Sequence, residues 1–251
     1  MTRSSSILIT GASGGIGRAT AVQCADRGAR IGIHYNGNRR AAEQLLGELR
    51  GDGHRIFRCD LADPDAAAWL INEANEGLHG LDVLVNNAGI YEGRRIDEID
   101  YTTWLDTWHR TLATNLAGPA NLSFLASKIM VEGGGGRIVN VSSRGAFRGE
   151  PGAPWYGAAK AGMNAMGQSM AQALGPRGVF IYTVAPGFVE TEMARQVLAS
   201  PQGDAIRKQS PMGRVAMPEE VASAICYLAF DAPAFMTGCI IDVNGASYLR
   251  S

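Results

Sequence analysis

The sequence lacks the features that mark several common classes of protein. It has no excess of charge of either sign, with 23 basic and 24 acidic residues in 251, and its arginines form nothing longer than the pairs Arg39-Arg40 and Arg94-Arg95. A protein that binds nucleic acid usually shows a basic patch or stripe. No apolar run of the roughly 18 residues that a membrane-spanning helix needs is present. We therefore expect a protein that binds neither nucleic acid nor membrane.

Motifs for metal binding are also missing. The four cysteines are widely spaced and form no C-x-x-C pair, and the four histidines belong to no H-E-x-x-H motif. We expect reduced, mostly buried thiols and no metal site. The segment before Ile7 is too short and too polar for a secretory signal, so the expected location is cytoplasmic.

What the sequence does contain is a regular alternation of apolar runs and helical patterns. The stretches expected to form strands are 6–10, 29–34, 54–58, 83–85, 137–141, 179–185 and 238–243. The stretches expected to form helices are 16–27, 40–50, 64–78, 103–130, 156–174 and 219–230. Continuously apolar strands indicate a sheet that is covered on both faces. The sequence therefore predicts an α/β fold with one domain, 1–251: a doubly wound parallel sheet (Rossmann fold) of about seven strands. Pro119 predicts a kink in the long helix.

A glycine-rich turn follows the first strand, where a doubly wound fold binds a dinucleotide. The turn reads Thr10-Gly-Ala-Ser-Gly-Gly-Ile-Gly17. Its glycines let the main chain approach a pyrophosphate, and the N-terminus of the next helix offers free N–H groups. The spacing of Gly11, Gly15 and Gly17 differs from the standard G-x-G-x-x-G fingerprint, so a merely flexible turn is the alternative. A P-loop phosphotransferase is excluded because no Gly-Lys-Ser/Thr follows.

The end of the second strand favours NADP(H) over NAD(H). NAD-binding sites usually place an acidic residue there to hold the ribose 2′-hydroxyl, whereas this chain has no acid before Glu43. Instead, Asn36, Asn38, Arg39 and Arg40 are able to donate hydrogen bonds to a 2′-phosphate. The alternative is that both arginines lie in solvent on the surface of the next helix.

A tyrosine and a lysine stand one helical turn apart in Tyr156-Gly-Ala-Ala-Lys160. The chain has seven tyrosines and three lysines, so the spacing alone is a weak signal. Its chemistry is informative, because a carbonyl reduced by hydride must gain a proton and an alcohol being oxidised must lose one. A free phenol has a pKa of about 10, and a nearby ammonium lowers it. We therefore expect Tyr156 to act as a general acid/base.

Two serines and an asparagine are candidates for supporting roles. Ser143 lies at the carboxyl end of the strand before the Tyr156 helix, where ligands of open α/β sheets collect. Its hydroxyl would bond the substrate oxygen as negative charge develops there. Ser142 is the competing candidate, and an ordinary loop serine is the alternative for either. Asn115 is a poor helix former inside the long helix, which suggests a side-chain role such as holding a water beside Lys160.

With these residues the chain resembles the short-chain dehydrogenases/reductases, and among them the group that includes the 3-oxoacyl-(acyl-carrier-protein) reductases. The resemblance extends from Ile7 to Gly245. The matching segments are Thr10-Gly-Ala-Ser-Gly-Gly-Ile-Gly17, Asp60-Leu61, Asn86-Asn-Ala-Gly89, Asn115, Val141-Ser-Ser143, Tyr156-x-x-x-Lys160 and Pro186-Gly-Phe-Val-Glu-Thr191. The resemblance implies an oxidoreductase that moves a hydride between NAD(P) and a carbonyl or secondary alcohol.

The resemblance also implies roles for individual residues. Tyr156 would be the catalytic acid/base, and Lys160 would tune it and bond the nicotinamide ribose. Ser143 would orient the substrate, and Asn115 would complete the proton relay. The candidate cofactor contacts, taken from the glycine turn, the second strand and the resemblance together, are Gly11, Ser13, Gly15, Ile16, Gly17, Asn36, Asp60, Leu61, Asn87, Ala88, Gly89, Tyr156, Lys160, Pro186, Gly187, Val189 and Thr191.

The sequence leaves the substrate open. The resemblance implies a 3-oxoacyl thioester, with acyl-carrier protein as a partner, but residues 132–136 hold an acid and glycines where relatives that bind this acidic carrier often carry basic residues. Arg148 and Glu150 make the expected rim more polar than a lipid-like substrate needs, so a sugar, polyol or cyclic ketone is the alternative. Residues 188–215, irregular apart from a short helix near 191–198, are expected to form a lid over the substrate.

A rival from another class is a protein that senses NADP by binding it and catalyses nothing. Such proteins typically lose the tyrosine or the lysine of the pair, and both are present here. The resemblance further implies a homotetramer built through the long helices and the C-terminal strand. Trp104 and Trp108, one turn apart on the long helix, are expected to pack in the core or in a subunit interface.

Overall fold

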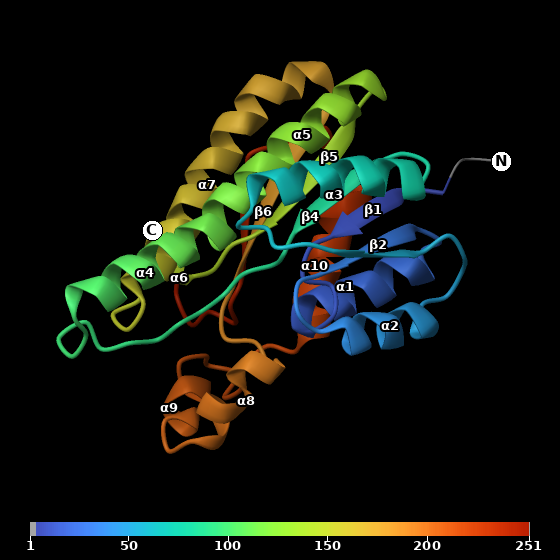
Figure 1. Ribbon diagram of the computed structural model, residues 1–251. Helices are drawn as coiled ribbons and strands as arrows, with labels where there is room; N and C mark the ends of the chain where they lie inside the picture. The colour runs from blue at the N-terminus through green and yellow to red at the C-terminus, as the bar shows by residue number, and fades with distance from the viewer. Residues whose placement is uncertain (1–3, 251) are drawn as a thin grey trace.

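The strands form where the apolar runs predict them. In the computed structural model, which describes residues 4–250, seven strands form one parallel sheet in the order β3-β2-β1-β4-β5-β6-β7 (Figure 1). The strands are β1 Ser6–Ile9, β2 Arg30–Tyr35, β3 Arg55–Arg58, β4 Val83–Asn86, β5 Gly136–Val141, β6 Val179–Pro186 and β7 Ile240–Val243. The chain proceeds outward from β1 to β3 and then returns to β4 beside β1. Ligands of doubly wound sheets bind at the carboxyl ends of the strands at such a switch point.

Helices cover both faces of the sheet, as the predicted Rossmann fold requires (Figure 1). The core on one face contains residues of α1, α2 and α10, and the core on the other face contains residues of α3, α5 and α7. The longer helices are α1 Gly15–Asp26, α2 Arg39–Glu48, α3 Pro64–Gly77, α4 Tyr101–Leu112, α5 Gly118–Glu132, α7 Pro154–Leu174 and α10 Pro218–Cys226. Within residues 4–250, no helix combines the length and apolar character needed to cross a membrane.

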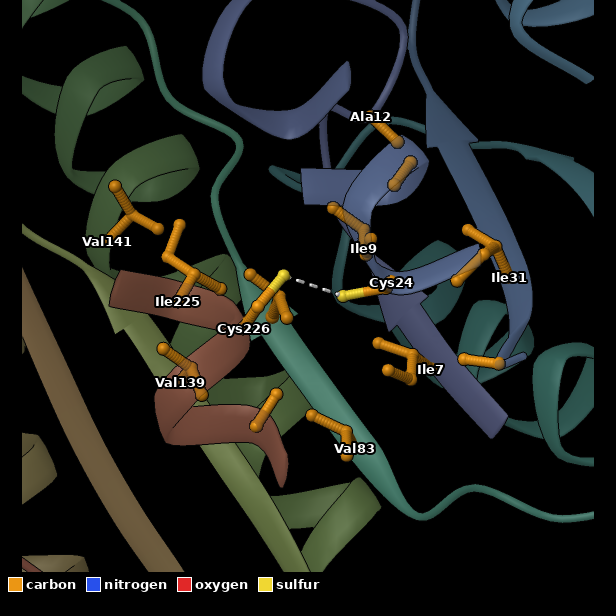
Figure 2. Close-up of a cluster of buried hydrophobic side chains, with 14 of the residues drawn as sticks. Ile7, Ile9, Ala12, Cys24, Ile31, Val83, Val139, Val141, Ile225 and Cys226 are labelled. Carbon is orange, nitrogen blue, oxygen red and sulfur yellow. Dashed lines mark hydrogen bonds between the residues drawn. The ribbon is translucent and has the colours of Figure 1, made fainter. Parts of the chain in front are cut away.

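The central strands are buried on both faces because their side chains alternate between the two cores. Ile7 and Ile9 belong to the core beneath α1 and α10, whereas Leu8 belongs to the opposite one. Figure 2 shows the first core, where Cys24 of α1 meets Cys226 of α10 with the two Sγ atoms 3.3 Å apart. The hydrogen bond with Cys226 and burial both raise the pKa of the Cys24 thiol, which therefore stays protonated. This contact links the first helix to the last one.

The long helix predicted at 103–130 is not a simple helix with a kink at Pro119. Instead, α4 continues through a π-helical segment, η1 Ala113–Ala117, into α5. Gly118 closes this segment, because its N–H donates to the carbonyl five residues earlier instead of four. Since Pro119 has no N–H, the carbonyl of Asn115 lacks the donor that an α-helix supplies four residues later. The irregularity therefore places Asn115 where its main chain departs from the helical pattern.

The segment between β6 and α10 contains two short helices, whereas the sequence predicts only one, near 191–198. These are α8 Glu192–Ala199 and α9 Gly203–Arg207. A helix of five residues is too short to show helical periodicity, which explains why α9 escapes prediction. The same holds for α6 Gly145–Arg148, between β5 and α7. Figure 1 shows α8 and α9 set apart from the two helical layers.

Main-chain hydrogen bonds join the two ends of this segment. The N–H of Ala216 donates to the carbonyl of Phe188 at 2.9 Å, and the N–H of Glu190 donates to the carbonyl of Ala216 at 2.8 Å. Val189 and Ala216 thus form an isolated parallel bridge. We refer to the residues enclosed by this bridge, 190–215, as the α8–α9 segment. Its ends are held together while its middle lies away from the sheet.

Candidate active site

The glycine turn between β1 and α1 forms a cradle that only glycine can build. Gly11 and Gly15 have φ angles of +61° and +52°, which residues with side chains rarely adopt. A Cβ at Gly17 would lie 2.4 Å from the Gly11 carbonyl oxygen, so a side chain there has no room. Gly14 precedes α1 without any side-chain cap, which leaves the N–H groups of the first turn open to an anion. The cradle therefore fits a pyrophosphate.

The hydroxyl of Thr10 connects this turn to the end of β4. Its Oγ1 accepts hydrogen bonds from the N–H groups of Asn87 and Ala88, both at 2.9 Å, and donates to the Val85 carbonyl at 3.2 Å. The side-chain Nδ2 of Asn87 donates two hydrogen bonds, one to the carbonyl of Thr10 at 2.8 Å and one to the carbonyl of Gly11 at 3.2 Å. Two motifs that are far apart in the sequence thus form one rigid surface.

His34 fixes the glycine turn from the β2 side. Its Nδ1 accepts a hydrogen bond from the N–H of Gly11 at 3.1 Å, and its Nε2 lies 3.2 Å from the carbonyl of Cys59. Because Nδ1 must accept, the proton of the neutral ring sits on Nε2. Burial lowers the pKa of His34 to about 4, although the Cys59 carbonyl acts in the opposite direction. Sequence reasoning missed this residue, since no motif marks a histidine that bonds a backbone N–H.

The tyrosine and lysine of α7 meet the end of β5. The Tyr156 phenol interacts with the side chain of Ser143, whose Oγ accepts a hydrogen bond from the N–H of Gly145 at 3.0 Å. Lys160 is buried, its Nζ donates to the Val141 carbonyl at 2.7 Å, and the same Nζ lies 5.8 Å from the centre of the Tyr156 ring. Phenol, hydroxyl and ammonium therefore gather at one point at the carboxyl edge of the sheet.

The geometry distinguishes the two candidate serines. Ser142 is buried, and its hydroxyl donates to the main-chain carbonyl of Lys160 at 3.3 Å. It therefore helps to hold α7 against β5. Ser143 is the serine whose hydroxyl meets Tyr156, which favours it as the residue that orients a substrate.

Burial dominates the electrostatics of this cluster. It raises the pKa of Tyr156 to about 12; the hydrogen bond with Ser143 acts against this rise, and the charges of Glu150 and Tyr91 add to it. Burial also lowers the pKa of Lys160 to about 8. The sequence analysis expected the ammonium to lower the pKa of the phenol. In the structure, loss of water around the phenol dominates and raises this pKa instead. The Nζ of Lys160 donates its hydrogen bond to the Val141 carbonyl of β5.

Asn115 reaches the same cluster from the π-helical segment. Its Oδ1 accepts from the N–H of Ile90 and its Nδ2 donates to the carbonyl of Ile90, both at 2.8 Å. Its side chain is therefore tied to the chain that follows β4 by one acceptor and one donor of its amide. A Cβ built at Gly89 would lie 3.2 Å from Asn115 Oδ1 and 3.6 Å from Lys160 Nζ. Gly89 thus lets these two side chains approach each other.

The candidates for a 2′-phosphate divide into two groups. Asn38 caps α2, where its side chain accepts a main-chain N–H at 3.0 Å, and Arg39 pairs with the glutamate one turn later at 2.8 Å. Asn36 and Arg40 are exposed, and no described residue forms an ion pair with Arg40. Arg58, at the end of β3, donates from Nε to the carbonyl of Asn36 at 3.2 Å. Sequence reasoning missed Arg58, whose position beside Asn36 depends on the pairing of β2 with β3.

The remaining candidate cofactor contacts lie along the same carboxyl edge. They are Ser13, Ile16, Asp60, Leu61, Ala88, Gly89, Pro186, Gly187, Val189 and Thr191. Asp60 turns its carboxylate to its own chain, where Oδ1 accepts from the N–H of Ala62 at 3.0 Å. Thr191, at the start of α8, approaches the glycine turn, since a Cβ at Gly15 would lie 3.0 Å from its methyl carbon. The structure therefore brings every sequence-predicted site residue to one edge of the sheet.

Polar and aromatic side chains surround Tyr156 on the substrate side. The ring of Tyr91 meets the Tyr156 ring edge to face, with centroids 5.1 Å apart. Nη2 of Arg148, the last residue of α6, lies 3.7 Å from Oε1 of Glu150, which precedes α7. Tyr91 is a further candidate that the sequence analysis missed, because it follows the Asn-Ala-Gly motif without belonging to it.

The tryptophans of α4 pack among themselves. Trp104 stacks on Trp108 with ring centroids 5.4 Å apart and meets the buried Trp155 at 5.5 Å. Trp155 Nε1 donates to the carbonyl of Glu92 at 3.0 Å. These contacts support the packing role expected for Trp104 and Trp108.

Comparisons with known proteins agree with this geometry. A family model described as enoyl-(acyl carrier protein) reductase matches residues 11–246. D-threitol dehydrogenase from Mycolicibacterium smegmatis is 37% identical over 245 residues, which cover 97% of this chain and 92% of that protein. The 3-oxoacyl-[acyl-carrier-protein] reductase FabG from Staphylococcus aureus is 34% identical over 251 residues, which cover 99% of this chain and 100% of that protein.

A solved structure shares the fold. It is a short chain dehydrogenase from Burkholderia cenocepacia J2315 in complex with NADP, with a TM-score of 0.87 and 29% sequence identity. The match covers 97% of each chain. The similarity therefore extends over nearly the whole sheet and its helices.

The tight contact at Gly17 yields a stability prediction. In Gly17→Ala the new methyl group overlaps the Gly11 carbonyl oxygen, and overpacking of this kind costs about 1–3 kcal/mol. We expect the midpoint of thermal unfolding to fall by about 3–10 °C. Gly14→Ala is the control, because no atom lies within 4 Å of a Cβ there and the backbone is extended. An unchanged midpoint in Gly17→Ala would contradict the contact.

The environment of His34 predicts a pH dependence of stability. An unfolded histidine has a pKa of about 6.5, and in the folded chain the pKa is about 4. Between these values the unfolded chain binds a proton that the folded chain does not, so stability falls as the pH falls, by up to about 3 kcal/mol at pH 4. Urea unfolding between pH 7.5 and 4.5 measures this. His34→Asn, which keeps an acceptor near Nδ1, should flatten the dependence, whereas the exposed control His109→Asn should not. Equal curves for the wild type and His34→Asn would disprove this assignment.

Proposed function

This chain belongs to the short-chain dehydrogenase/reductase family of oxidoreductases, and from that membership we propose that Tyr156, Ser143 and Lys160 perform the proton transfer of an NADP(H)-dependent reaction on a carbonyl or secondary alcohol. The observation that carries the proposal is the meeting of the Tyr156 phenol with the Ser143 side chain, with the buried Lys160 Nζ 5.8 Å from the centre of the Tyr156 ring. A proton donor, an oxygen-binding hydroxyl and a fixed positive charge are what such a reaction requires.

The proposed mechanism assigns one step to each group. When bound, the nicotinamide supplies the hydride in reduction and takes it up in oxidation. The Tyr156 hydroxyl gives its proton to the substrate oxygen during reduction and removes it during oxidation. The Ser143 hydroxyl donates a hydrogen bond to that oxygen as negative charge develops. Lys160 stabilises the phenolate and passes a proton back to it. The carbonyl of Asn115, left without its helical donor by Pro119, supports a water on this path.

The pKa values favour protonation of the site at neutral pH. The pKa of Tyr156 is about 12, so the free protein holds its proton ready for a carbonyl. Reduction can therefore begin without prior deprotonation. Oxidation needs the phenolate, whose formation depends on positive charge close to the ring. We assign that charge to Lys160, whose pKa is about 8 and whose Nζ lies 5.8 Å from the centre of the Tyr156 ring.

The residues of the cradle fit a dinucleotide, and three residues that follow β2 or end β3 favour the phosphorylated form. The open N-terminus of α1 and the close approach at Gly17 suit a pyrophosphate. Asn36 and Arg40 follow β2, Arg58 bonds the Asn36 carbonyl from the end of β3, and no acidic residue stands at the end of β2, which supports recognition of a 2′-phosphate by these three residues. The Burkholderia relative is in complex with NADP, which supports the same choice.

Two substrate classes compete. The Staphylococcus relative is named for a 3-oxoacyl substrate on acyl-carrier protein, and the Mycolicibacterium relative is named for threitol, a polyol. The pair Arg148 and Glu150, together with the hydroxyl of Tyr91, provides hydrogen-bonding groups close to Tyr156. This observation favours a hydroxylated or otherwise polar substrate as a second candidate beside the acyl thioester.

We further propose that residues 1–251 act as one domain, in the cytoplasm, with residues 188–215 as the substrate lid. A non-catalytic sensor is disfavoured because the tyrosine, the lysine and the serine that the proposed reaction needs are all present and lie close together. A homotetramer is supported by apolar side chains exposed on the outer surface, among them Phe124 on α5 and Phe235 before β7.

Removal of the proposed proton donor tests the function directly. In Tyr156→Phe the ring stays but the proton is lost, so we expect kcat for carbonyl reduction to fall by about 10²–10⁴-fold. Cofactor affinity, measured by fluorescence titration with NADPH, should remain within about twofold. Tyr227→Phe, an exposed tyrosine far from the site, is the control. Near wild-type turnover in Tyr156→Phe would reject the assignment.

Cofactor choice has its own test. Asn36→Asp places a negative charge beside the proposed 2′-phosphate position, and the repulsion should lower the ratio of kcat/KM for NADPH to that for NADH by about tenfold. Arg58→Gln should lower the ratio in the same direction. Arg39→Gln is the control, because Arg39 is already paired within α2. A ratio unaffected by both Asn36→Asp and Arg58→Gln would refute the 2′-phosphate site.

A further inference from the structure

A second buried cation lies next to the proposed catalytic serine. Arg144 follows Ser143 directly, and only 3% of its surface is exposed. Its main-chain N–H donates to the carbonyl of Pro186 at 2.9 Å, which fixes it across the ends of β5 and β6. Its guanidinium lies 5.3 Å from the centre of the Phe188 ring. The proposed mechanism gives this residue no role.

The guanidinium has only neutral partners. Nη1 donates to the hydroxyl of Ser247 at 2.6 Å, and Nη2 donates to the side-chain oxygen of Gln209. Among residues 4–250, no carboxylate lies within ion-pair distance of Arg144. Burial and the nearby charge of Arg148 lower its pKa to about 10 although the charge of Glu150, which lies beyond ion-pair distance, acts in the opposite direction, so Arg144 remains charged at neutral pH. A buried charge without a counter-charge is costly, which is why such a charge is usually found paired.

Arg144 also lines a cavity of about 200 Å³. Ser210 and Met212 of the α8–α9 segment form one wall, and Asn244 and Gly245, after β7, form another. The other charged side chains of this wall are already paired, Arg214 with Glu220 and Asp242 with Arg250, each at 2.7 Å. Among the described residues, Arg144 is therefore the charged group of the cavity that lacks a counter-charge.

We propose that this cavity binds an oxyanion, a carboxylate or a phosphate group, with Arg144 as its partner. The planar guanidinium presents N–H groups in a fork that matches the two oxygens of such a group. The anion takes the place of the neutral contacts to Gln209 and Ser247, both of which belong to chain segments that border the cavity. Its source is either a free small anion or an anionic part of the substrate, since Arg144 adjoins Ser143.

Binding is tested on the protein without cofactor or substrate, so this arm does not depend on the proposed function. Malonate and inorganic phosphate serve as probes, with sodium chloride at equal ionic strength as the reference. At about 100-fold excess over Kd, a bound anion should raise the midpoint of thermal unfolding by about 5 °C. The rise should disappear in Arg144→Gln and persist in Arg214→Gln. In Arg144→Lys the rise should require about tenfold higher anion concentration. Absence of the rise in the wild type, or an equal rise in Arg144→Gln, would overturn the proposal.

Arg144→Lys keeps the test decisive if Arg144→Gln does not fold. The lysine retains the positive charge but lacks the paired N–H groups of the guanidinium, so half-saturation with malonate should require about tenfold higher concentration. Unchanged affinity in Arg144→Lys, measured by isothermal titration calorimetry, would then overturn the proposal.

A kinetic comparison distinguishes the two sources, and this arm rests on the proposed oxidoreductase function. Acetoacetate carries a carboxylate, whereas its ethyl ester does not. If the substrate supplies the anion, Arg144→Gln should raise KM for acetoacetate by about tenfold and leave the ester unaffected, and malonate should compete with acetoacetate. If a separate anion binds, malonate should stabilise the protein without competing. Loss of turnover with intact malonate binding would count against the function and not against this site.

Discussion

The hydroxyl of Thr10 holds together two segments that the chain separates by more than seventy residues. It accepts hydrogen bonds from the N–H groups of Asn87 and Ala88, which follow β4, and Thr10 itself stands where β1 leads into the glycine turn. This contact exists because β1 and β4 are paired in parallel at the switch point of the sheet. His34 supports the same turn from β2. The position of a dinucleotide, and hence its distance from Tyr156, depends on this junction.

Much of the fold follows from the sequence, because most strands are apolar runs and helical patterns separate them along the chain. The glycine turn, the Tyr156–Lys160 pair and Ser143 also follow, since each combines unusual residue types at a fixed spacing or strand end. The assignment of the chain to its family, predicted on these motifs, is confirmed by relatives that match nearly its whole length. The site roles themselves stay predictions.

The features that escape prediction depend on contacts between distant segments or on very short elements. No pattern of residues distinguishes the π-helical segment Ala113–Ala117 from the α-helices on either side of it. The helix α9 has too few residues to show helical periodicity. Arg58 becomes relevant only because β3 pairs with β2, and Asn38 proves to be a helix cap. Burial, which sets the charge state of Tyr156 and Lys160, is a property of the packed molecule and not of a motif.

The bridge between Val189 and Ala216 has a consequence for how such proteins diversify. It closes the α8–α9 segment at its base, so the chain enters and leaves this region at one point of the sheet. A loop whose ends are already joined changes in length at little entropic expense. The α8–α9 segment can therefore differ in length and sequence between relatives while β6, β7 and α10 keep their positions. Substrate preference can thus evolve separately from the stability of the sheet.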